Sequence, residues 1–305
     1  MGDQFPDQQA LATLKWPEGQ DHKWGLAYTA QRETLIRFGS MQQLPPLPAI
    51  APRSTALFLD FDGTLADLAP QPEAVRLADD LVILLRLLFS HVDGALAIVS
   101  GRRLSDLDEF LHPLVLPTAA EHGAQRRLAD GQLVGLLAPD LQHAITAASA
   151  LAIQHPRLRV EVKNAAVALH YRHAPELETL CLQIMTEAAR ASTGVELLRG
   201  KYVFEIKPAG VSKGTAIATF MLHAPFAGRI PLFAGDDVTD EAGFAAVQSL
   251  GGSGIKVGDG ETVAQHRCAS PAALRQWLRD ACPNSGLVPG NPGLNTKKSF
   301  QGMTS

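Results

Sequence analysis

The chain has 305 residues, 46% of them hydrophobic, and it carries 27 basic against 31 acidic side chains, for a net charge of −4. This length can form a core domain plus a smaller second one, and the balanced charge provides no basic field of the kind that binds nucleic acid. The cysteines, Cys181, Cys268 and Cys282, are widely spaced, which favours reduced packing thiols in the cytoplasm over a disulfide framework.

Residues 1–49 form a weakly patterned N-terminal extension, with a possible helix over residues 29–38 and a proline-rich linker over residues 44–48. The start of the chain lacks the basic segment and apolar core of a targeting signal. The longest apolar stretch, residues 81–89, is interrupted by Arg86 and is far shorter than the roughly 20 residues of a membrane span. We therefore expect a core helix there and no membrane partner.

Two aspartates follow the first apolar run. Residues 56–59 predict a short buried strand, and Asp60 and Asp62 come directly after it, before Gly63. In open α/β sheets, ligands bind at the carboxyl ends of strands. One carboxylate there can attack a phosphate while its neighbour transfers a proton, with Mg²⁺ between the oxygens and the substrate. The alternative is an ordinary strand with a polar turn.

A second apolar run, residues 95–98, leads into Val99, Ser100 and Gly101, and a helix is predicted over residues 104–111. A serine hydroxyl and the backbone N–H groups at a helix start can hold a phosphate. A simple turn would have the same composition, so this segment indicates a phosphate site only in combination with the other motifs of the chain.

The middle of the chain predicts an inserted domain. Helices are expected over residues 141–154 and 175–193, and strands over residues 159–163, 166–171, 195–198 and 202–206. This order fits an α+β insert over residues 138–208 with its own sheet. The core domain would then comprise residues 50–137 and 209–284, and the Gly-, Pro-, Asn- and Ser-rich residues 285–305 would be a flexible tail.

Two charged segments follow the insert. Ser212 can cap a helix whose first turn holds Lys213, although a lysine there opposes the helix dipole unless it faces an anionic site. Asp236, Asp237, Asp240 and Glu241 then come directly after a strand predicted over residues 230–234. Four acids within six residues repel one another unless a hard cation neutralises them, so we expect a magnesium site, with a helix cap as the alternative.

Taken in this order, the acidic pair, Ser100, Lys213 and the second acidic segment resemble the four signature motifs of the haloacid dehalogenase superfamily, in its phosphatase branch. The resemblance implies a doubly wound, Rossmann-like α/β core with an inserted α+β cap domain that closes over the active site. It also implies that Asp60 is the nucleophile forming an aspartyl-phosphate and that Asp62 is the general acid and base.

The same resemblance implies the remaining roles in the core. Ser100, Gly101 and Lys213 would hold the phosphate, and Lys213 would also serve catalysis. Mg²⁺ would be bound by the Asp60 side chain, the Asp62 backbone carbonyl and Asp236. Asp237 and Asp240 would support the metal ligands.

A narrower resemblance covers about residues 54–280. Segments Glu121-His122-Gly123, Glu161-Val162-Lys163, His170-Tyr171-Arg172 and Glu205-Ile206-Lys207-Pro208 look like those of the trehalose-6-phosphate phosphatase family. It implies hydrolysis of trehalose 6-phosphate to trehalose and phosphate, with the distal glucose held by Glu161, Lys163 and Glu205.

Several alternatives stay open at this level. Charges alternating along a strand usually mark a solvated face, His122 and His170 can be structural, and Gln125 stands where the family often has an acid. The substrate could be another sugar phosphate, of the sucrose 6-phosphate or mannosyl phosphate type. The chain could also be a sugar phosphomutase or a non-catalytic sugar-phosphate-binding module, although the intact acidic motifs argue against the last.

The expected partner is thus a small sugar phosphate rather than nucleic acid or a membrane. No region of glycosyltransferase size precedes the phosphatase motifs, so we expect the upstream trehalose-phosphate synthase to be a separate protein.

Overall fold

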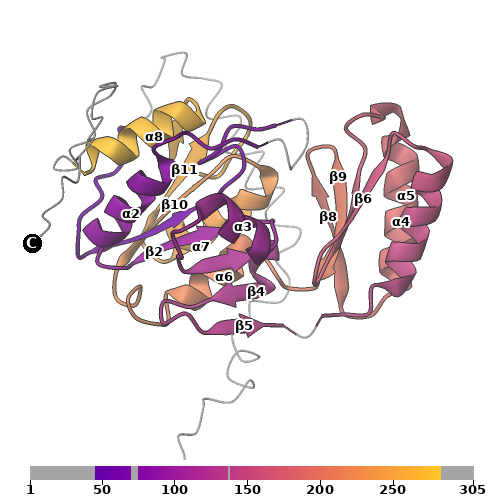
Figure 1. Ribbon diagram of the computed structural model, residues 1–305, viewed down its shortest axis with the longest axis horizontal. Coiled ribbons are helices and arrows are strands. Elements are labelled where there is room, and N and C mark those ends of the chain that lie inside the picture. Colours follow the sequence, from indigo (N-terminus) through magenta and orange to yellow (C-terminus); the bar gives the residue numbers. More distant parts are fainter. Residues whose placement is uncertain (1–44, 70–74, 137, 283–305) are drawn as a thin grey trace, which may run out of the picture. The chain divides into compact units, whose positions relative to one another are not determined.

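The computed structural model describes residues 45–282, except for residues 70–74 and residue 137. The helix expected over residues 29–38 and the expected C-terminal tail lie outside the described residues. The described part contains two β-sheets, one of eight strands and one of four (Figure 1).

The eight-stranded sheet is mainly parallel, with strands in the order β12-β11-β10-β1-β2-β3-β4-β5. Its parallel strands are β1 (Thr55–Leu59), β2 (Leu96–Val99), β3 (Thr118–Ala120), β10 (Ile230–Gly235), β11 (Ser253–Val257) and β12 (His266–Cys268). Two short antiparallel strands, β4 (Gln125–Arg127) and β5 (Leu133–Gly135), complete one edge. Since β1 lies in the centre, its carboxyl end lies between those of β10 and β2.

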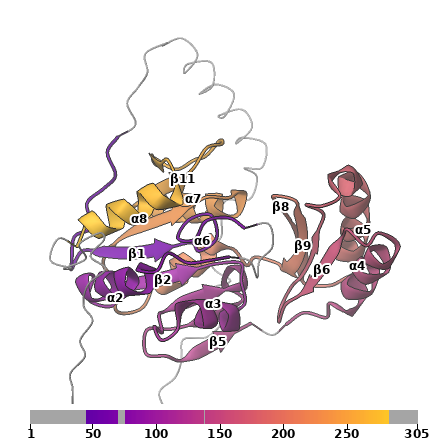
Figure 2. The ribbon, with the colours of Figure 1, turned by 45° about the horizontal axis from the view of Figure 1, so that its top comes forward.

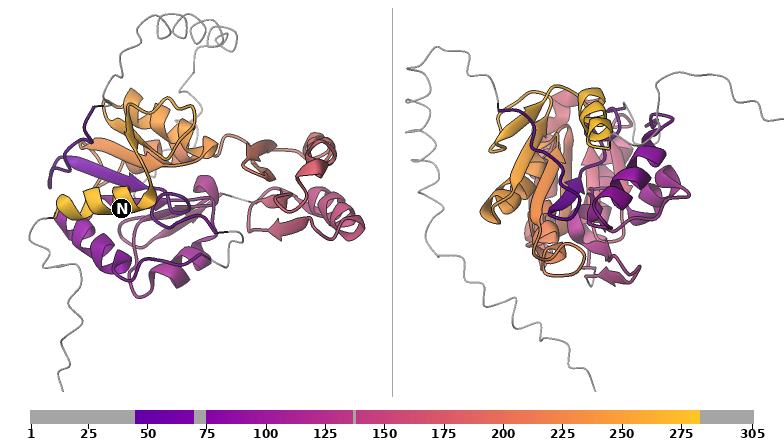
Figure 3. Two further views of the ribbon diagram at one scale, coloured as in Figure 1. Left: turned by 90° about the horizontal axis from the view of Figure 1, so that it is seen from above. Right: turned by 90° about the vertical axis from the view of Figure 1, so that its left-hand side faces the viewer.

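Helices cover both faces of this sheet (Figure 3). Helices α2 (Leu81–His91) and α8 (Pro271–Asp280) contact one another, as do α6 (Lys213–Phe220) and α7 (Glu241–Ser249). Helix α3 (Leu104–Leu111) follows β2, and a short 3-10 helix, η5 (Val238–Asp240), leads into α7.

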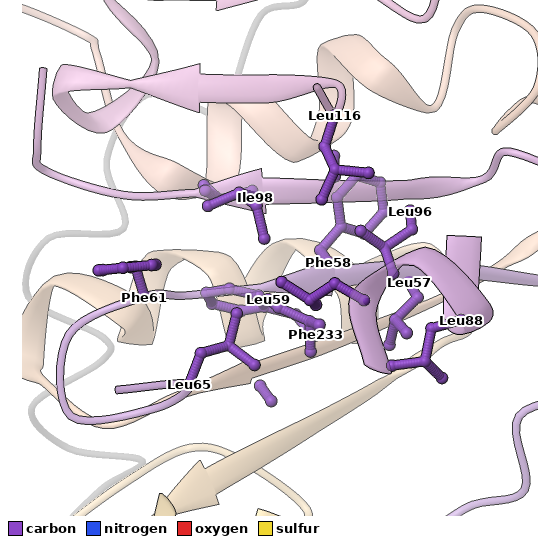
Figure 4. Packing of buried hydrophobic residues seen from close by; sticks show 14 of the residues in the cluster. Leu57, Phe58, Leu59, Phe61, Leu65, Leu88, Leu96, Ile98, Leu116 and Phe233 are labelled. Carbon is purple, nitrogen blue, oxygen red and sulfur yellow. The ribbon is translucent and has the colours of Figure 1, made fainter. Parts of the chain in front are cut away.

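Strand β1 shows why both faces need a helical cover. All five of its residues are buried. The ring of Phe58 stacks on that of Phe226 at 5.3 Å between centroids, whereas Leu57 points to the opposite side, toward Leu88 of α2 (Figure 4). Such a continuous apolar strand is stable only between two layers of helices. The predicted doubly wound α/β fold is confirmed.

An inserted unit, defined here as residues 142–208, separates β5 from α6. It contains an antiparallel sheet in the order β6-β7-β9-β8, with helices α4 and α5 packed together on one face (Figure 2). Its elements are α4 (Gln142–Gln154), β6 (Arg159–Val162), β7 (Val167–His170), η4 (Pro175–Leu177), α5 (Glu178–Arg190), β8 (Val195–Gly200) and β9 (Val203–Pro208). The predicted order of helices and strands is confirmed, with shifted ends.

The inserted unit has its own apolar cluster, which includes Leu151, Met185, Phe204 and Ile206 and is separate from the cluster around the eight-stranded sheet. The three cysteines are free and buried in these two clusters, as packing thiols would be. Across residues 45–69, 75–136 and 138–282, no helix combines the length and the apolar character that crossing a bilayer requires.

Candidate active site

The carboxylate of Asp60 lies at the carboxyl end of β1, where the predicted nucleophile was expected. Asp60 is buried, and its Oδ1 accepts a hydrogen bond from Lys213 Nζ at 2.6 Å, while its Oδ2 accepts one from the Thr64 hydroxyl at 3.2 Å. Burial raises the pKa of Asp60 well above its usual range, against the lowering effect of the Lys213 charge. The Lys213 charge therefore opposes the effect of burial and favours the ionised form of this carboxyl group, although burial is the larger effect.

Lys213 occupies the first position of α6, and Ser212 caps that helix through a capping box with Thr215. The lysine also donates a hydrogen bond to Asp240 Oδ1 at 2.7 Å. Burial alone would lower the pKa of Lys213, but the charges of Asp240 and Asp60 raise it above its usual range. The unfavourable position of a lysine at a helix start is thus offset by two buried carboxylates.

The loop after β10 brings a third carboxylate to the same place. The carboxylate oxygens of Asp60, Asp236 and Asp240 lie within 4.8 Å of one another. Burial, and then the charge of Asp240, raises the pKa of Asp236 to about 7. The Oδ2 atom of Asp240 accepts hydrogen bonds from the backbone N–H groups of Asp236, at 3.0 Å, and Asp237, at 2.9 Å. Asp240, which accepts three hydrogen bonds from the residues described, therefore holds the loop that carries Asp236 in place.

Two glycines bring the main chain into direct contact with these acids. A Cβ atom on Gly63, which has φ of +73°, would lie 2.1 Å from Asp236 Oδ2, and one on Gly235 would lie 2.3 Å from Asp240 Cγ. Because neither position has room for a methyl group, glycine is required for the main chain to lie this close to the carboxylates.

This donor set fits a divalent cation. Hard cations such as Mg²⁺ prefer carboxylate oxygens, and a bound cation would offset both the burial and the mutual repulsion that raise the pKa values of Asp60 and Asp236. Asp62 is not part of this carboxylate cluster. Its predicted metal contact through the backbone carbonyl stays a prediction.

The side chain of Asp62 is held by Arg102 instead. Arg102 donates from Nε to Asp62 Oδ2 and from Nη2 to Oδ1, both at 2.7 Å. Its guanidinium group also lies over the rings of Phe110, at 4.9 Å, and Phe61, at 5.6 Å. The sequence gives Arg102 no role by itself, since its partner Asp62 lies 40 positions away.

Ser100 and Gly101 follow β2, beside Asp60. Ser100 is buried, and its hydroxyl accepts a hydrogen bond from the backbone N–H of Arg102 at 3.3 Å. A Cβ atom on Gly101 would lie 2.8 Å from the ring of His122, so that ring borders the predicted phosphate-binding residues. The Gly101 carbonyl accepts a hydrogen bond from Lys163 of the inserted unit at 2.9 Å.

The predicted residues of both sheets line one cavity of about 970 Å³. Its lining includes Asp60, Asp62, Ser100, Gly101, Lys213, Asp236, Asp237, Glu161, Lys163 and Glu205. Asp240 is fully buried beneath it. The structure therefore brings the reactive carboxylates and the charged strands of the inserted unit to a common space.

Within the inserted unit, Lys163 donates to Glu205 Oε2 at 2.7 Å, and His170 lies 2.9 Å from Glu161. Burial would raise the pKa of Glu205, but the charges of Lys163 and His122 lower it. The Oε1 atom of Glu205 is buried and has no hydrogen-bond partner among the described residues, and His122 Nε2, at 3.6 Å, is too far away to donate. A ligand hydroxyl in the cavity could satisfy this oxygen.

Sequence reasoning assigned no site role to Glu121, His122, His170 or Lys256. Lys256 donates to the backbone carbonyl of Asp236, and His122 and His170 line the cavity. The resemblance had already drawn attention to the segment that holds Glu121 and His122, but its contacts depend on residues far away in the sequence.

A model of the trehalose-phosphatase family matches residues 58–275. A trehalose-6-phosphate phosphatase of Escherichia coli is 42% identical over 231 residues, which are 73% of this chain and 85% of the relative. A probable trehalose-phosphate phosphatase of Sinorhizobium fredii is 42% identical over 205 residues, which are 67% and 77% of the two chains. A bifunctional trehalose-6-phosphate synthase/phosphatase of Thermoproteus tenax is 36% identical, and the match covers 32% of it.

Solved structures agree with these relatives. A trehalose-6-phosphate phosphatase related protein superposes with a TM-score of 0.62 at 31% identity, covering 75% of this chain and 97% of that one. The C-terminal domain of the Candida albicans trehalose-6-phosphate phosphatase gives a TM-score of 0.68 at 24% identity, which supports the fold, over 76% and 93% of the two chains. The chain belongs to the trehalose-phosphatase family.

Proposed function

We propose that the chain hydrolyses trehalose 6-phosphate to trehalose and phosphate through a phosphoaspartate formed on Asp60. The observation that carries the proposal is a shared cavity. The buried Asp60 carboxylate, held by Lys213 at 2.6 Å, lines the same space as Glu161, Lys163 and Glu205 of the inserted unit. A reactive carboxylate and a polar sugar-binding surface in one cavity suit a phosphorylated sugar.

The reaction needs two displacements at phosphorus. In the first, an oxygen of Asp60 attacks the phosphorus atom, the bond to the sugar oxygen breaks, and Asp62 gives that oxygen a proton. In the second, Asp62 takes a proton from water, whose oxygen attacks the same phosphorus atom, and the bond to Asp60 breaks to release phosphate. Arg102 donates one hydrogen bond to each oxygen of Asp62, which leaves a second lone pair on each oxygen to carry the proton.

Ser100, Gly101 and Lys213 hold the transferred phosphate in this proposal. Lys213 lies between Asp60 and Asp240, so its charge offsets the repulsion between an anionic phosphate and the attacking carboxylate. Mg²⁺, held by Asp60, Asp236 and the backbone of Asp62, would supply further positive charge to the phosphate oxygens. Asp240 and Asp237 keep the loop that carries Asp236 in place.

In this proposal the chain has a core domain, residues 50–137 and 209–284, and a cap domain, residues 138–208. The cap domain selects the substrate. The buried Oε1 of Glu205, which has no hydrogen-bond partner in the described part of the chain, supports a hydroxyl-binding role for the cap. Together, Glu161, Lys163 and Glu205 offer acceptors and donors to a disaccharide that has many hydroxyl groups and little apolar surface.

Truncating each of these cap residues to alanine should separate substrate choice from chemistry. We expect kcat/KM for trehalose 6-phosphate to fall about 10- to 150-fold, the worth of one hydrogen bond to a charged group. Turnover of p-nitrophenyl phosphate should change little, because it is too small to reach the cap. Glu196→Ala is the matched control, since Glu196 pairs with Lys207 and does not line the cavity. Equal losses on both substrates would refute the assignment.

Magnesium binding should depend on pH. A cation can bind Asp236 only after its proton leaves, and the pKa of Asp236 is raised to about 7. Below pH 7 the proton competes with the metal, and above it the competition disappears. Apparent Mg²⁺ affinity should therefore fall about tenfold or more from pH 8 to pH 6, as measured by calorimetric titration. An affinity that stays constant over this range would contradict the assignment of Asp236 as a ligand.

A panel of sugar phosphates, assayed with and without Mg²⁺, tests the reaction itself. Trehalose 6-phosphate should be preferred over glucose 6-phosphate, sucrose 6-phosphate and mannosyl phosphates. Activity that survives thorough chelation would exclude the metal. Isomerisation without phosphate release would indicate a mutase, and binding without turnover would indicate a binding module.

We also propose that the substrate comes from a trehalose-phosphate synthase on another chain and that hydrolysis takes place in the cytoplasm. The three buried free thiols are compatible with a reducing compartment. Cell fractionation and affinity purification from the native organism would test both points.

A further inference from the structure

A buried carboxylate outside the catalytic motifs joins the two sheets. Glu121 opens the short 3-10 helix η3 (Glu121–Gly123) after β3, and it is 1% exposed. Glu121 and His122 both have positive φ angles, of 48° and 60°, a region that residues other than glycine rarely adopt. A backbone conformation of this kind persists only where the surrounding contacts hold it.

On one side, Glu121 and His122, called here the corner, form hydrogen bonds with the predicted phosphate-binding loop. The backbone N–H of Glu121 donates to the Arg102 carbonyl at 2.9 Å, and that of His122 donates to the Ser100 carbonyl, also at 2.9 Å. The ring of His122 lies directly against Gly101. The corner and the loop that carries Ser100 and Gly101 therefore form one hydrogen-bonded unit.

On the other side, the Glu121 carboxylate reaches the turn between β6 and β7. Its Oε2 accepts a hydrogen bond from the backbone N–H of Ala165 at 2.8 Å, and its Oε1 accepts one from that of Asn164 at 3.2 Å. Ala165 also packs with Ala124 and Val211 in a small apolar cluster beside these bonds. The turn is thus held to Glu121 both by two hydrogen bonds and by apolar packing.

The residue before this turn is Lys163, which the proposed function assigns to the sugar. Lys163 donates both to Glu205 at 2.7 Å and to the Gly101 carbonyl at 2.9 Å. By anchoring the two N–H groups that follow Lys163, Glu121 fixes the distance between the sugar-binding side chains and the phosphate-binding loop.

We propose that Glu121 is a positioning residue for the reaction on the disaccharide phosphate. It aligns the cap with the phosphate-binding loop, so that a sugar bound through Lys163 and Glu205 places its phosphate in line with Asp60. This role rests on the proposed function, because it presumes that the cap binds the sugar. If Glu121 served folding alone, its removal would lower activity on every substrate to the same extent.

The test compares Glu121→Ala and Glu121→Gln, with Asp108→Asn as the control. Asp108 pairs with the neighbouring Arg127 through two hydrogen bonds and does not line the cavity. For Glu121→Ala, we expect kcat/KM on trehalose 6-phosphate to fall about 10- to 150-fold, while kcat/KM on p-nitrophenyl phosphate changes less than about twofold. Glu121→Gln should be intermediate, since its amide keeps one acceptor oxygen. Asp108→Asn should leave the ratio of the two activities unchanged.

Amide hydrogen exchange gives a readout that does not depend on activity. The N–H groups of Asn164 and Ala165 should exchange faster in both Glu121 variants than in the wild type and in the Asp108 control. Unchanged exchange, or equal losses on both substrates, would overturn the proposal. If the alanine variant fails to fold, the glutamine variant decides by the same criteria. A failure of the proposed function is distinguishable, since the wild type would then not release phosphate from trehalose 6-phosphate.

Discussion

Replacing Asp60 with asparagine should abolish phosphate release while leaving the fold intact. An amide oxygen can still accept the hydrogen bond from Lys213, and the amide nitrogen can donate to Thr64, so the buried contacts of Asp60 are kept in a neutral form. An amide cannot form the phosphoaspartate. We expect kcat on trehalose 6-phosphate to fall by about 10⁵-fold or more, as when a nucleophile is removed from other hydrolases.

The matched control is Asp67→Asn. Asp67 follows the same strand, but its carboxylate is 68% exposed and pairs with Arg275 at 3.3 Å, outside the cavity. This variant should release phosphate at the wild-type rate. A folded Asp60→Asn variant with the same turnover as the control would mean that another group is the nucleophile.

Replacing Lys213 with methionine should damage both stability and catalysis. The ammonium group is the shared partner of two buried carboxylates, and its loss leaves Asp60 and Asp240 facing one another without compensation. Breaking a buried ion pair in this way costs about 3–5 kcal/mol of unfolding free energy. Because the same charge would stabilise the transferred phosphate, kcat should fall about 10³-fold. Denaturant unfolding and phosphate release measure the two effects.

Lys207→Met separates these effects. Lys207 is also buried, and it bonds to Glu196 and to the Val211 carbonyl, away from the carboxylate cluster. We expect this variant to lose stability but to keep most of its turnover at a temperature where it is folded. A similar loss of turnover in both lysine variants would show that destabilisation alone explains the effect at Lys213.

The sequence predicted the parts of the fold that local patterns determine. The apolar runs before Asp60, Ser100 and Asp236 lie in neighbouring parallel strands, because a strand buried on both faces must be apolar along its whole length. The expected helix over residues 104–111 agrees with α3 at both ends. The strands β3, β4, β5, β11 and β12 were not predicted. All except β11 have three residues, which are too few for a period to be recognised.

The site was predictable only where chemistry is concentrated in short segments. Acidic clusters and a lysine at a helix start are visible in the sequence, and the structure gathers Asp60, Lys213 and Asp236 around one cavity. The partner of Asp62 could not be found in this way, because the Arg102 contact depends on how two strand ends meet in space. The same holds for Glu121, whose carboxylate reaches amide groups more than 40 positions further along the chain.

The separate apolar clusters of the two sheets bear on how the family can diversify. Residues of β6 and β9 that face α4 and α5, such as Val160, Phe204 and Ile206, pack only within the inserted unit, whereas Glu161 and Glu205 alternate with them and line the cavity. A change at a cavity-facing position of β6 or β9 therefore leaves the apolar packing of the eight-stranded sheet unchanged. If these strands bind the sugar as proposed, changes at their cavity-facing positions can alter the choice of sugar while the packing around Asp60 stays the same. A library that varies Glu161 and keeps the buried Lys163–Glu205 ion pair should contain mostly folded variants.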